Sequence, residues 1–384
     1  MDDTLCGLID APALPVYDLG ADHPFARHRQ LPLFDLIDRM GMATPAERMT
    51  AVPAGPLDLE LAHDADYIAM VEATSAARTT PAQRASALGF GLGTSDNPIA
   101  VGQHAAAAAV VGATLTCVRA VLAGQRRHAL NTAGGLHHAF RRRASGFCIY
   151  NDLVAGIRAA RQAGVDRVLY VDFDVHHGDG VEDAFAGDPG VVTVSFHQSP
   201  ETLFPGTGRA EDIGRGAARG SIVNMPFAPF TDDASWWECV AAILPAVVRR
   251  FRPGLIVSQH GCDPHREDPL AQLMLTTAPM RRAARMVREL ADEVCGGRWV
   301  ATGGGGYQPY SVTPRAWSLV WLEMSERPVP TRIDPGWIAA WQPECAEPLA
   351  AEFEDAPVAA SPRTAQAQEI NRRTLDRVLS LQGI

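Results

Sequence analysis

The pattern of apolar and polar positions predicts strands that alternate with helices along most of the chain. Expected strands span residues 128–132, 167–171, 191–196, 255–259 and 299–302, and expected helices span residues 152–163, 235–251 and 279–294. The strand segments are short apolar runs rather than alternating ones, which is typical of parallel strands buried on both faces. The sequence therefore predicts a parallel sheet covered by helices on both sides.

The segments around this alternation are less regular. A helix is expected over residues 27–40, a capped helix start over residues 63–71, a loop over residues 89–98 and a buried Ala-rich helix over residues 103–122. No repeat or linker interrupts residues 1–327, which are predicted to form one domain. Residues 328–384 are rich in Pro, Ala and acids, and predict a peripheral, partly mobile extension that ends in a short helix over residues 364–381.

Four of the predicted strands run into polar or glycine-rich sequence. The four segments are GGLHH, DFDVHHGDG, QHGCDPHREDPL and GGGGY. Right-handed crossovers bring the carboxyl ends of parallel strands to one edge of a sheet, where ligands bind in open α/β folds. The four segments are therefore expected to form a single active site.

The second of these segments predicts a metal site. Asp174 and His176 are two residues apart, so an extended chain directs both side chains to the same side. Carboxylate and imidazole ligands without thiolates suit Zn²⁺ or Fe²⁺, and a catalytic metal normally takes a third protein ligand. Asp263, after the strand at residues 255–259, is the preferred candidate for it. By spacing alone, the remaining candidates are His260, His265 and Asp268.

Acid–base groups are expected beside the metal. His137 and His138 follow two glycines, and histidine has a pKa suited to both accepting and donating a proton. Asp172 and Asp179 could orient these imidazoles. Tyr307 follows four glycines and could donate its hydroxyl to an oxyanion. A structural His-His loop and a Tyr that only packs are the alternatives.

Composition narrows the class of protein further. The net charge is −10, which disfavours nucleic acid as a partner, and all 34 basic residues are arginine. The acidic N-terminus has no signal pattern and no apolar run is expected to reach the length of a membrane span, so the protein is expected to be cytoplasmic. Seven scattered cysteines predict reduced thiols rather than disulfides.

Taken together, six ordered motifs resemble the histone deacetylase superfamily. They are GGLHHAF, SGFCIYND, YVDFDVHHGDGVEDAF, SFHQSPETLFPGTG, GCDPHREDPL and GGGGY, and the resemblance spans about residues 14–327. QHGCDPHREDPLAQL and YDLGADHPF look most like the bacterial acetoin-utilisation deacetylases. The resemblance implies an α/β arginase-deacetylase fold with a central eight-stranded parallel sheet, and Zn²⁺ held by Asp174, His176 and Asp263.

The resemblance also implies roles for single residues. His137 and His138 match the tandem catalytic histidines, with Asp172 and Asp179 as their partners, and Tyr307 matches the transition-state tyrosine. The substrate-binding positions that match are Asp96 at the rim and Gly146, Phe147, Phe204, Leu270 and Gly305 along an acyl-lysine tunnel. The positions that match K⁺ ligands are Asp172, Asp174, His176, Ser195 and Phe196, and at a second site Phe185, Asp188 and Val191, where the charged Asp188 departs from the family pattern.

The implied activity is zinc-dependent hydrolysis of Nε-acetyl-lysine in proteins. Acetylated metabolic enzymes such as acetyl-CoA synthetase would be substrates, and neither nucleic acid nor membrane is an expected partner. An acetylpolyamine amidohydrolase with the same chemistry is one alternative. A non-catalytic acyl-group binding protein is another, although it would be expected to have lost a ligand or the tyrosine. The sequence does not predict the oligomeric state.

Overall fold

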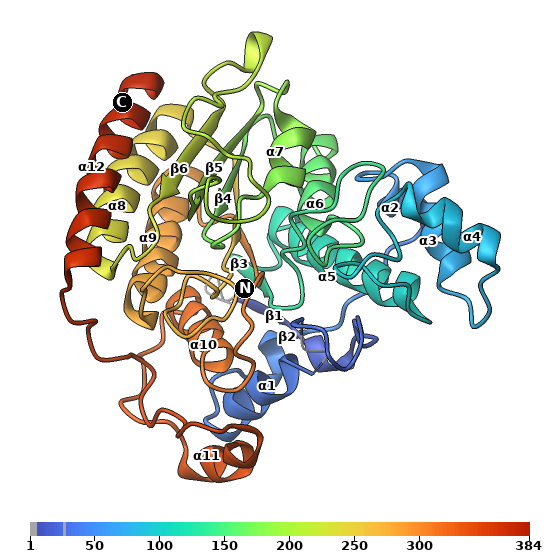
Figure 1. The fold of residues 1–384 in the computed structure, drawn as a ribbon, viewed down its shortest axis with the longest axis horizontal. Helices are drawn as coiled ribbons and strands as arrows, with labels where there is room; N and C mark the ends of the chain where they lie inside the picture. Colours follow the sequence, from blue (N-terminus) through green and yellow to red (C-terminus); the bar gives the residue numbers. More distant parts are fainter. Residues whose placement is uncertain (1–5, 26–27) are drawn as a thin grey trace.

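The computed structural model describes residues 6–25 and 28–384 and contains one eight-stranded parallel sheet. The strand order is β2-β1-β3-β8-β7-β4-β5-β6 (Figure 1). The strands are β1 (Gly7–Ile9), β2 (Arg48–Met49), β3 (His128–Asn131), β4 (Val168–Asp172), β5 (Val191–Gln198), β6 (Ile222–Phe227), β7 (Leu255–Gln259) and β8 (Trp299–Thr302). The predicted parallel sheet is confirmed.

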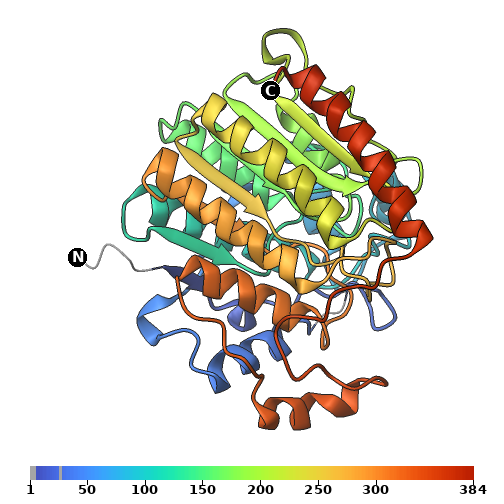
Figure 2. The same ribbon diagram turned by 90° about the vertical axis from the view of Figure 1, so that its left-hand side faces the viewer.

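Helices cover both faces of the sheet. They are α1 (Gln30–Arg39), α2 (Pro56–Leu59), α3 (Ala65–Thr74), α4 (Pro81–Leu88), α5 (Gln103–Leu122), α6 (Asp152–Gln162), α7 (Asp179–Phe185), α8 (Asp233–Phe251), α9 (Thr277–Cys295), α10 (Thr313–Met324), α11 (Pro335–Trp341) and α12 (Pro362–Gln382). On one face, α12, α8 and α9 lie side by side (Figure 2). On the other face, α5 and α6 pack together.

Alternate residues of each strand divide the core into two layers. In β4, Leu169 and Val171 join the cluster formed with α8, α9 and α10, whereas Val168 and Tyr170 join the cluster formed with α5 and α6. Successive side chains of a strand point to opposite faces, so a strand buried on both sides must be apolar throughout. The continuous apolar runs in the sequence have this physical origin.

Several elements differ from the sequence-based prediction. The first long helix begins at Gln30 rather than at Arg27, which lies outside the described residues. β1 and β2 have three and two residues, too few to show a period. β6 contains Asn224 and Pro226, and proline is tolerated there because β6 is an edge strand.

The expectation that no apolar run reaches the length of a membrane span was wrong: one helix passes this test of length and composition. α5 has 20 residues and a mean hydropathy of 1.8, which is long and apolar enough to cross a bilayer. However, 78% of this apolar stretch is buried inside the protein, where α5 packs on α6 and β3. The apolar composition therefore matches the core position that was expected for this helix.

The C-terminal extension is not peripheral, and its last helix is not short. α12 has 21 residues and packs on β6 and α8 (Figures 1 and 2). Phe353, Leu375 and Val378 are buried in the same cluster as α8 and α9. Asn371 accepts a hydrogen bond from the backbone N–H of Ala228, next to β6. The extension thus covers an edge of the sheet, and the division at residue 327 stays a prediction.

Asp355 attaches the extension to the rest of the protein. One carboxylate oxygen accepts a hydrogen bond from Arg315 Nη1 at 2.8 Å, and the other lies 3.0 Å from His265 Nε2. The second oxygen also accepts from the backbone and hydroxyl of Thr277. Burial alone would raise the pKa of Asp355, but His265 and Arg315 outweigh it and hold the pKa well below its usual value.

Replacing Asp355 by Asn should lower the free energy of unfolding by about 3 kcal/mol, because Arg315 loses a buried charge partner. A carboxylate with a depressed pKa stabilises the fold fully above its unfolded pKa of about 3.9, and the stabilisation is lost as the pH falls below that value. Urea unfolding of both proteins should therefore give a constant difference at neutral pH and a shrinking one below about pH 4.

Glu369→Gln is the control for this measurement, because Glu369 pairs with Arg373 on the exposed face of α12. It should leave the stability nearly unchanged. A difference for Asp355→Asn that does not shrink in acid would contradict the assignment of the stabilisation to the ionised carboxylate.

Candidate active site

The carboxyl ends of four neighbouring strands, β3, β8, β7 and β4, form one aligned row, which continues into β5 at Ser195. In the sheet register, Asn131 pairs with Thr302, Thr302 with Gln259, Gln259 with Asp172, and Asp172 with Ser195. The four polar or glycine-rich segments noted in the sequence begin at or just beyond this row. The prediction that they share one edge of the sheet is confirmed.

Asp174, His176 and Asp263 come together just beyond this row. His176 Nδ1 lies 3.1 Å from Asp174 Oδ1 and 3.0 Å from Asp263 Oδ2. The three potential ligand atoms lie within 4.8 Å of one another, and all three residues are buried. Two loops, after β4 and after β7, therefore supply one compact set of oxygen and nitrogen donors.

Neighbouring groups hold the two carboxylates in place. Asp174 Oδ2 accepts hydrogen bonds from Gln259 Nε2 at 2.6 Å and from the backbone N–H of Gly305 at 2.7 Å. Asp263 Oδ1 accepts from the backbone N–H of Val175 at 2.9 Å. These bonds leave Asp174 Oδ1 and Asp263 Oδ2 to face His176 Nδ1.

Gln259 is a site residue that the sequence-based prediction missed. Its side chain also accepts a hydrogen bond from the backbone N–H of Gly261 at 2.7 Å. The available signal was its position, because Gln259 is a long polar residue at the end of an otherwise mainly apolar strand, LIVSQ. Buried polar groups of this kind normally have a specific partner.

Two glycines let the backbone pass close to these carboxylates. A Cβ on Gly305 would lie 2.0 Å from Asp263 Oδ2 and 2.9 Å from Asp174 Oδ2. A Cβ on Gly261 would lie 2.2 Å from Asp174 Oδ2. Any larger residue at either position would displace a carboxylate.

The electrostatics of this group favour a cation. Burial raises the pKa of Asp263, and the adjacent Asp174 raises it further. Burial lowers the pKa of His176, but Asp174 and Asp263 outweigh it and raise it to about 10. Two buried carboxylates beside one imidazole, with their oxygens turned inward, fit a divalent metal that accepts oxygen and nitrogen ligands.

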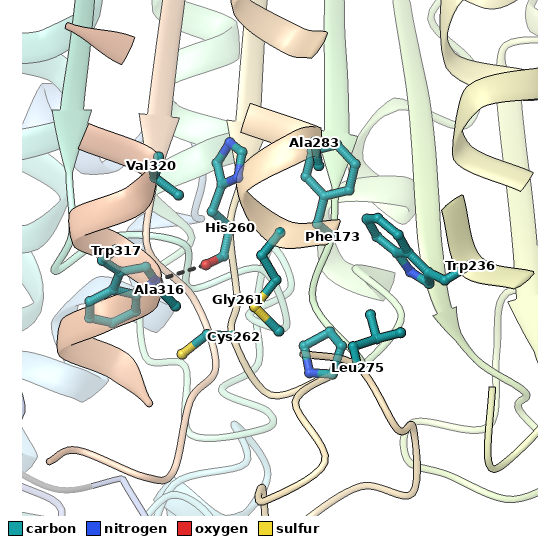
Figure 3. A pocket seen from close by; sticks show the side chains of 12 residues that line it. Phe173, Trp236, His260, Gly261, Cys262, Leu275, Ala283, Ala316, Trp317 and Val320 are labelled. Carbon is teal, nitrogen blue, oxygen red and sulfur yellow. Dashed lines mark hydrogen bonds between the residues drawn. The ribbon is translucent and has the colours of Figure 1, made fainter. Parts of the chain in front are cut away.

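The other residues considered for the third ligand position have different surroundings. His260 lies in an apolar pocket between Phe173 and Trp317 (Figure 3), and burial lowers its pKa to about 3. His265 contacts Asp355. Asp268 accepts backbone hydrogen bonds from Leu270 and Tyr307. Among the described residues, the ligand atoms of Asp263 are the ones that lie close to those of both Asp174 and His176.

Each of the tandem histidines contacts one carboxylate. His137 Nδ1 lies 2.7 Å from Asp172 Oδ2, and His138 Nδ1 lies 2.7 Å from Asp179 Oδ1. Burial would lower the pKa of His137, but Asp172 and Asp174 outweigh it and raise it to about 9, whereas burial and the neighbouring His137 lower the pKa of His138 to about 4. The ring centroids lie 4.0 Å apart. Two adjacent imidazoles of one site therefore differ in how readily they are protonated.

Aromatic rings surround the approach to these groups. Phe147 contacts Tyr307 edge to face at 5.8 Å, and Phe204 contacts His138 in the same way at 5.0 Å. Phe204 is 44% exposed and lies at the outer end. Gly146 has φ +50°, and a Cβ there would lie 2.4 Å from His138 Cδ2. Tyr307 is half-buried, with its backbone N–H bonded to Asp268.

Other predicted positions lie farther out or carry no contact to these groups. Asp96 is exposed in the loop after α4, where its carbonyl oxygen contacts His23 Nε2 at 3.3 Å. Leu270 is half-buried. His177, the residue after His176, instead contacts Thr207 and Glu182.

The positions matched to K⁺ ligands are distributed over two places. The first set is buried at and just beyond the end of β4 and in the neighbouring part of β5, and comprises Asp172, Asp174, His176, Ser195 and Phe196. Phe185, Asp188 and Val191 lie in the turn from α7 to β5, joined by backbone hydrogen bonds. There, Asp188 Oδ1 accepts from the backbone N–H of Gly190, so its side chain is engaged within the turn.

Comparison with known proteins agrees with this arrangement. The model of the histone deacetylase domain matches residues 23–324. "Acetoin utilization protein AcuC" of Bacillus subtilis (strain 168) is 39% identical over 97% of this chain and 96% of its own length. The protein of the same name from Staphylococcus aureus (strain MRSA252) is 34% identical, over 93% and 92%.

Solved structures give the same result. The crystal structure of a histone deacetylase homologue from Aquifex aeolicus superimposes with a TM-score of 0.85 at 29% identity, covering 97% of this chain and 99% of its own. A homologue complexed with SAHA gives equal values. The sheet and its flanking helices are therefore the arginase-deacetylase fold.

The chain belongs to the histone deacetylase family. It is a deacetylase of that family, of the AcuC type, and its class of reaction is amide hydrolysis. The family fold implies a metal cofactor, and the donor set of Asp174, His176 and Asp263 fits one.

Replacing Gly305 by Ala should reduce the metal affinity by about tenfold to a hundredfold, because its Cβ would displace the carboxylate of Asp263. Elemental analysis of the purified variant after dialysis against a metal buffer measures this change. Gly187→Ala is the matched control, since no atom lies within 4 Å of its added Cβ. An unchanged metal content in Gly305→Ala would contradict the assignment.

Proposed function

We propose that this protein hydrolyses the acetyl amide of Nε-acetyl-lysine in proteins, with Zn²⁺ as its metal. The observation that carries the proposal is the arrangement of Asp174, His176 and Asp263 beside the paired histidines, each with its own carboxylate partner. Fe²⁺ suits the same donors and is the alternative metal.

The metal would be held by Asp174, His176 and Asp263. When bound, it supplies a Lewis acid that polarises the acetyl carbonyl and lowers the pKa of water. A set of two carboxylates and one imidazole leaves room for substrate and water, as catalytic sites require. Gln259 keeps Asp174 in position through its amide.

His138 acts as the general base and then as the general acid. Its Nδ1 is engaged by Asp179, so its Nε2 is the atom that exchanges protons with the reactants. It takes a proton from the attacking water as the oxygen bonds to the acetyl carbon. It returns a proton to the leaving lysine nitrogen as the carbon–nitrogen bond breaks, which gives acetate and a free amine. His137, beside Asp172, supports the charge balance of this pair.

Tyr307 donates its hydroxyl to the oxyanion of the tetrahedral intermediate. Gly146, Phe147, Phe204 and Leu270 form the walls of the tunnel for the lysine side chain, and Gly305 lines its inner end. Aromatic faces suit an aliphatic stem, because they bury it without offering competing hydrogen bonds. Asp96, exposed at the rim, accepts hydrogen bonds from the substrate backbone.

A K⁺ ion is proposed beside the metal, held by oxygens of Asp172, Asp174, His176, Ser195 and Phe196. Its charge would offset part of the buried negative charge there. A second K⁺ is proposed at Phe185, Asp188 and Val191, through backbone oxygens. Engagement of the Asp188 side chain within its own turn leaves that backbone ligation possible.

A protein substrate is preferred over a small acetylated amine, because no long insertion stands out in the sequence and Phe204 is 44% exposed. An acetylated metabolic enzyme such as acetyl-CoA synthetase is the proposed partner, and the similar proteins are named for a metabolic process, acetoin utilization. A cytoplasmic location agrees with such a partner. Neither nucleic acid nor membrane is part of the proposal.

Replacing Tyr307 by Phe should lower kcat by about a hundredfold, because one oxyanion donor is lost. KM should change little, since the hydroxyl acts on the transition state. Steady-state kinetics with an acetyl-lysine peptide measures both constants. Turnover at the wild-type rate would exclude this role for Tyr307.

Purified protein should deacetylate acetyl-lysine peptides better than acetylated putrescine or spermidine. A chelator should abolish the activity, and Zn²⁺ should restore it. Because the enzyme contains no lysine, an amine-reactive dye reports the released lysine with little background from the enzyme itself. Activity confined to polyamines would overturn the substrate class, and activity indifferent to chelators would overturn the metal mechanism.

A further inference from the structure

Asp268 joins two loops of the site through a single buried carboxylate. It is only 7% exposed. Oδ1 accepts a hydrogen bond from the backbone N–H of Leu270 at 3.0 Å, and Oδ2 accepts one from the backbone N–H of Tyr307 at 2.9 Å. Leu270 follows β7 and Tyr307 follows β8, so this carboxylate connects the tunnel wall to the tyrosine.

The backbone before Tyr307 has little stiffness of its own. Gly303, Gly304, Gly305 and Gly306 precede it, and Gly304 and Gly306 have φ values of +151° and +145°. Glycine backbone populates many conformations, so its position depends on external anchors. Gly305 is anchored by hydrogen bonds to Asp174 and Cys262, but Tyr307 itself is anchored at its N–H by Asp268.

The side chain of Tyr307 packs against an apolar cluster that includes Leu136 and Cys148. Its ring meets Phe147 edge to face at 5.8 Å. Within the described part of the chain, no hydrogen bond involves its hydroxyl group. The direction of the hydroxyl therefore depends on this apolar packing and on the backbone to which the ring is attached.

We propose that Asp268 is a positioning residue for the reaction: its carboxylate holds Tyr307 in the orientation from which the hydroxyl reaches the oxyanion. This inference rests on the proposed role of Tyr307. An ionised carboxylate only accepts hydrogen bonds, and it offers an oxygen to each of the two N–H groups. An amide has one oxygen, so Asp268→Asn would present an NH₂ group to one of these backbone donors.

A double-mutant cycle tests the proposal, with Asp268→Asn, Tyr307→Phe and the double variant assayed on an acetyl-lysine peptide. Asp268→Asn should lower kcat by about tenfold or more, with a smaller rise in KM from the loosened Leu270. In the Tyr307→Phe background, Asp268→Asn should have little further effect on kcat, because both substitutions remove the same contribution, that of the oriented Tyr307 hydroxyl. Metal content should stay at the wild-type value.

Asp233→Asn is the matched control. Asp233 also accepts from a backbone N–H and a hydroxyl, both of Thr276, at the start of α8. The Asp233→Asn variant should have a lower free energy of unfolding and an unchanged kcat. If Asp268→Asn does not yield folded protein, Asp268→Ala in the same cycle replaces it, because alanine removes both acceptors without adding a donor.

The outcomes separate this inference from the proposed function. If Tyr307→Phe lowers kcat and the effects of the two substitutions multiply, Asp268 does not act through Tyr307, and the inference is overturned. Wild-type kcat in Asp268→Asn, or a loss explained by lost metal, overturns it as well. If Tyr307→Phe itself retains full turnover, the proposed oxyanion donor is wrong, and the inference falls with it.

Discussion

The burial of several carboxylates at one edge of the sheet is the constraint on which the site depends. Asp172, Asp174 and Asp263 are all at most 1% exposed. An unpaired buried carboxylate is very costly, so each must find donors within the fold. Asp172 is bonded by Tyr170 and His137, and Asp174 by Gln259 and Gly305. The carboxylate oxygens that accept none of these bonds face His176, and a cation bound there would offset the remaining negative charge.

Close approach of the backbone is the means by which these charges are satisfied. Gly261 and Gly305 pass so near to the carboxylates that a Cβ would overlap an oxygen. Backbone N–H groups can then donate where no side chain would fit. The glycines that allow this close approach also leave the backbone before Tyr307 without a preferred conformation of its own. The glycine loop therefore depends on acceptors in neighbouring loops, and Asp268 is one of them.

The loop that carries Asp263 is held from two directions. On its inner side, Gln259 bonds to Gly261, and Gly305 to Cys262. On its outer side, His265 contacts Asp355 in the C-terminal extension. The extension covers the edge strand β6 with α12 and at the same time supports a loop of the active site. Its packing thus contributes to the positions of groups far away in the sequence.

The sequence by itself determined the parallel sheet, most of its strands, and the edge at which the chemistry lies, because buried strands and their polar ends leave a local signal. The bounds of α5, β7 and β8 follow from that signal without change. The tertiary structure decided what depends on distant contacts. It brought Asp263 rather than His260, His265 or Asp268 to His176, it gave Gln259 a role, and it packed the extension against β6. Strands as short as β1 and β2 show no recognisable alternation of apolar and polar residues, and hydrogen bonds between distant loops leave no pattern in the sequence.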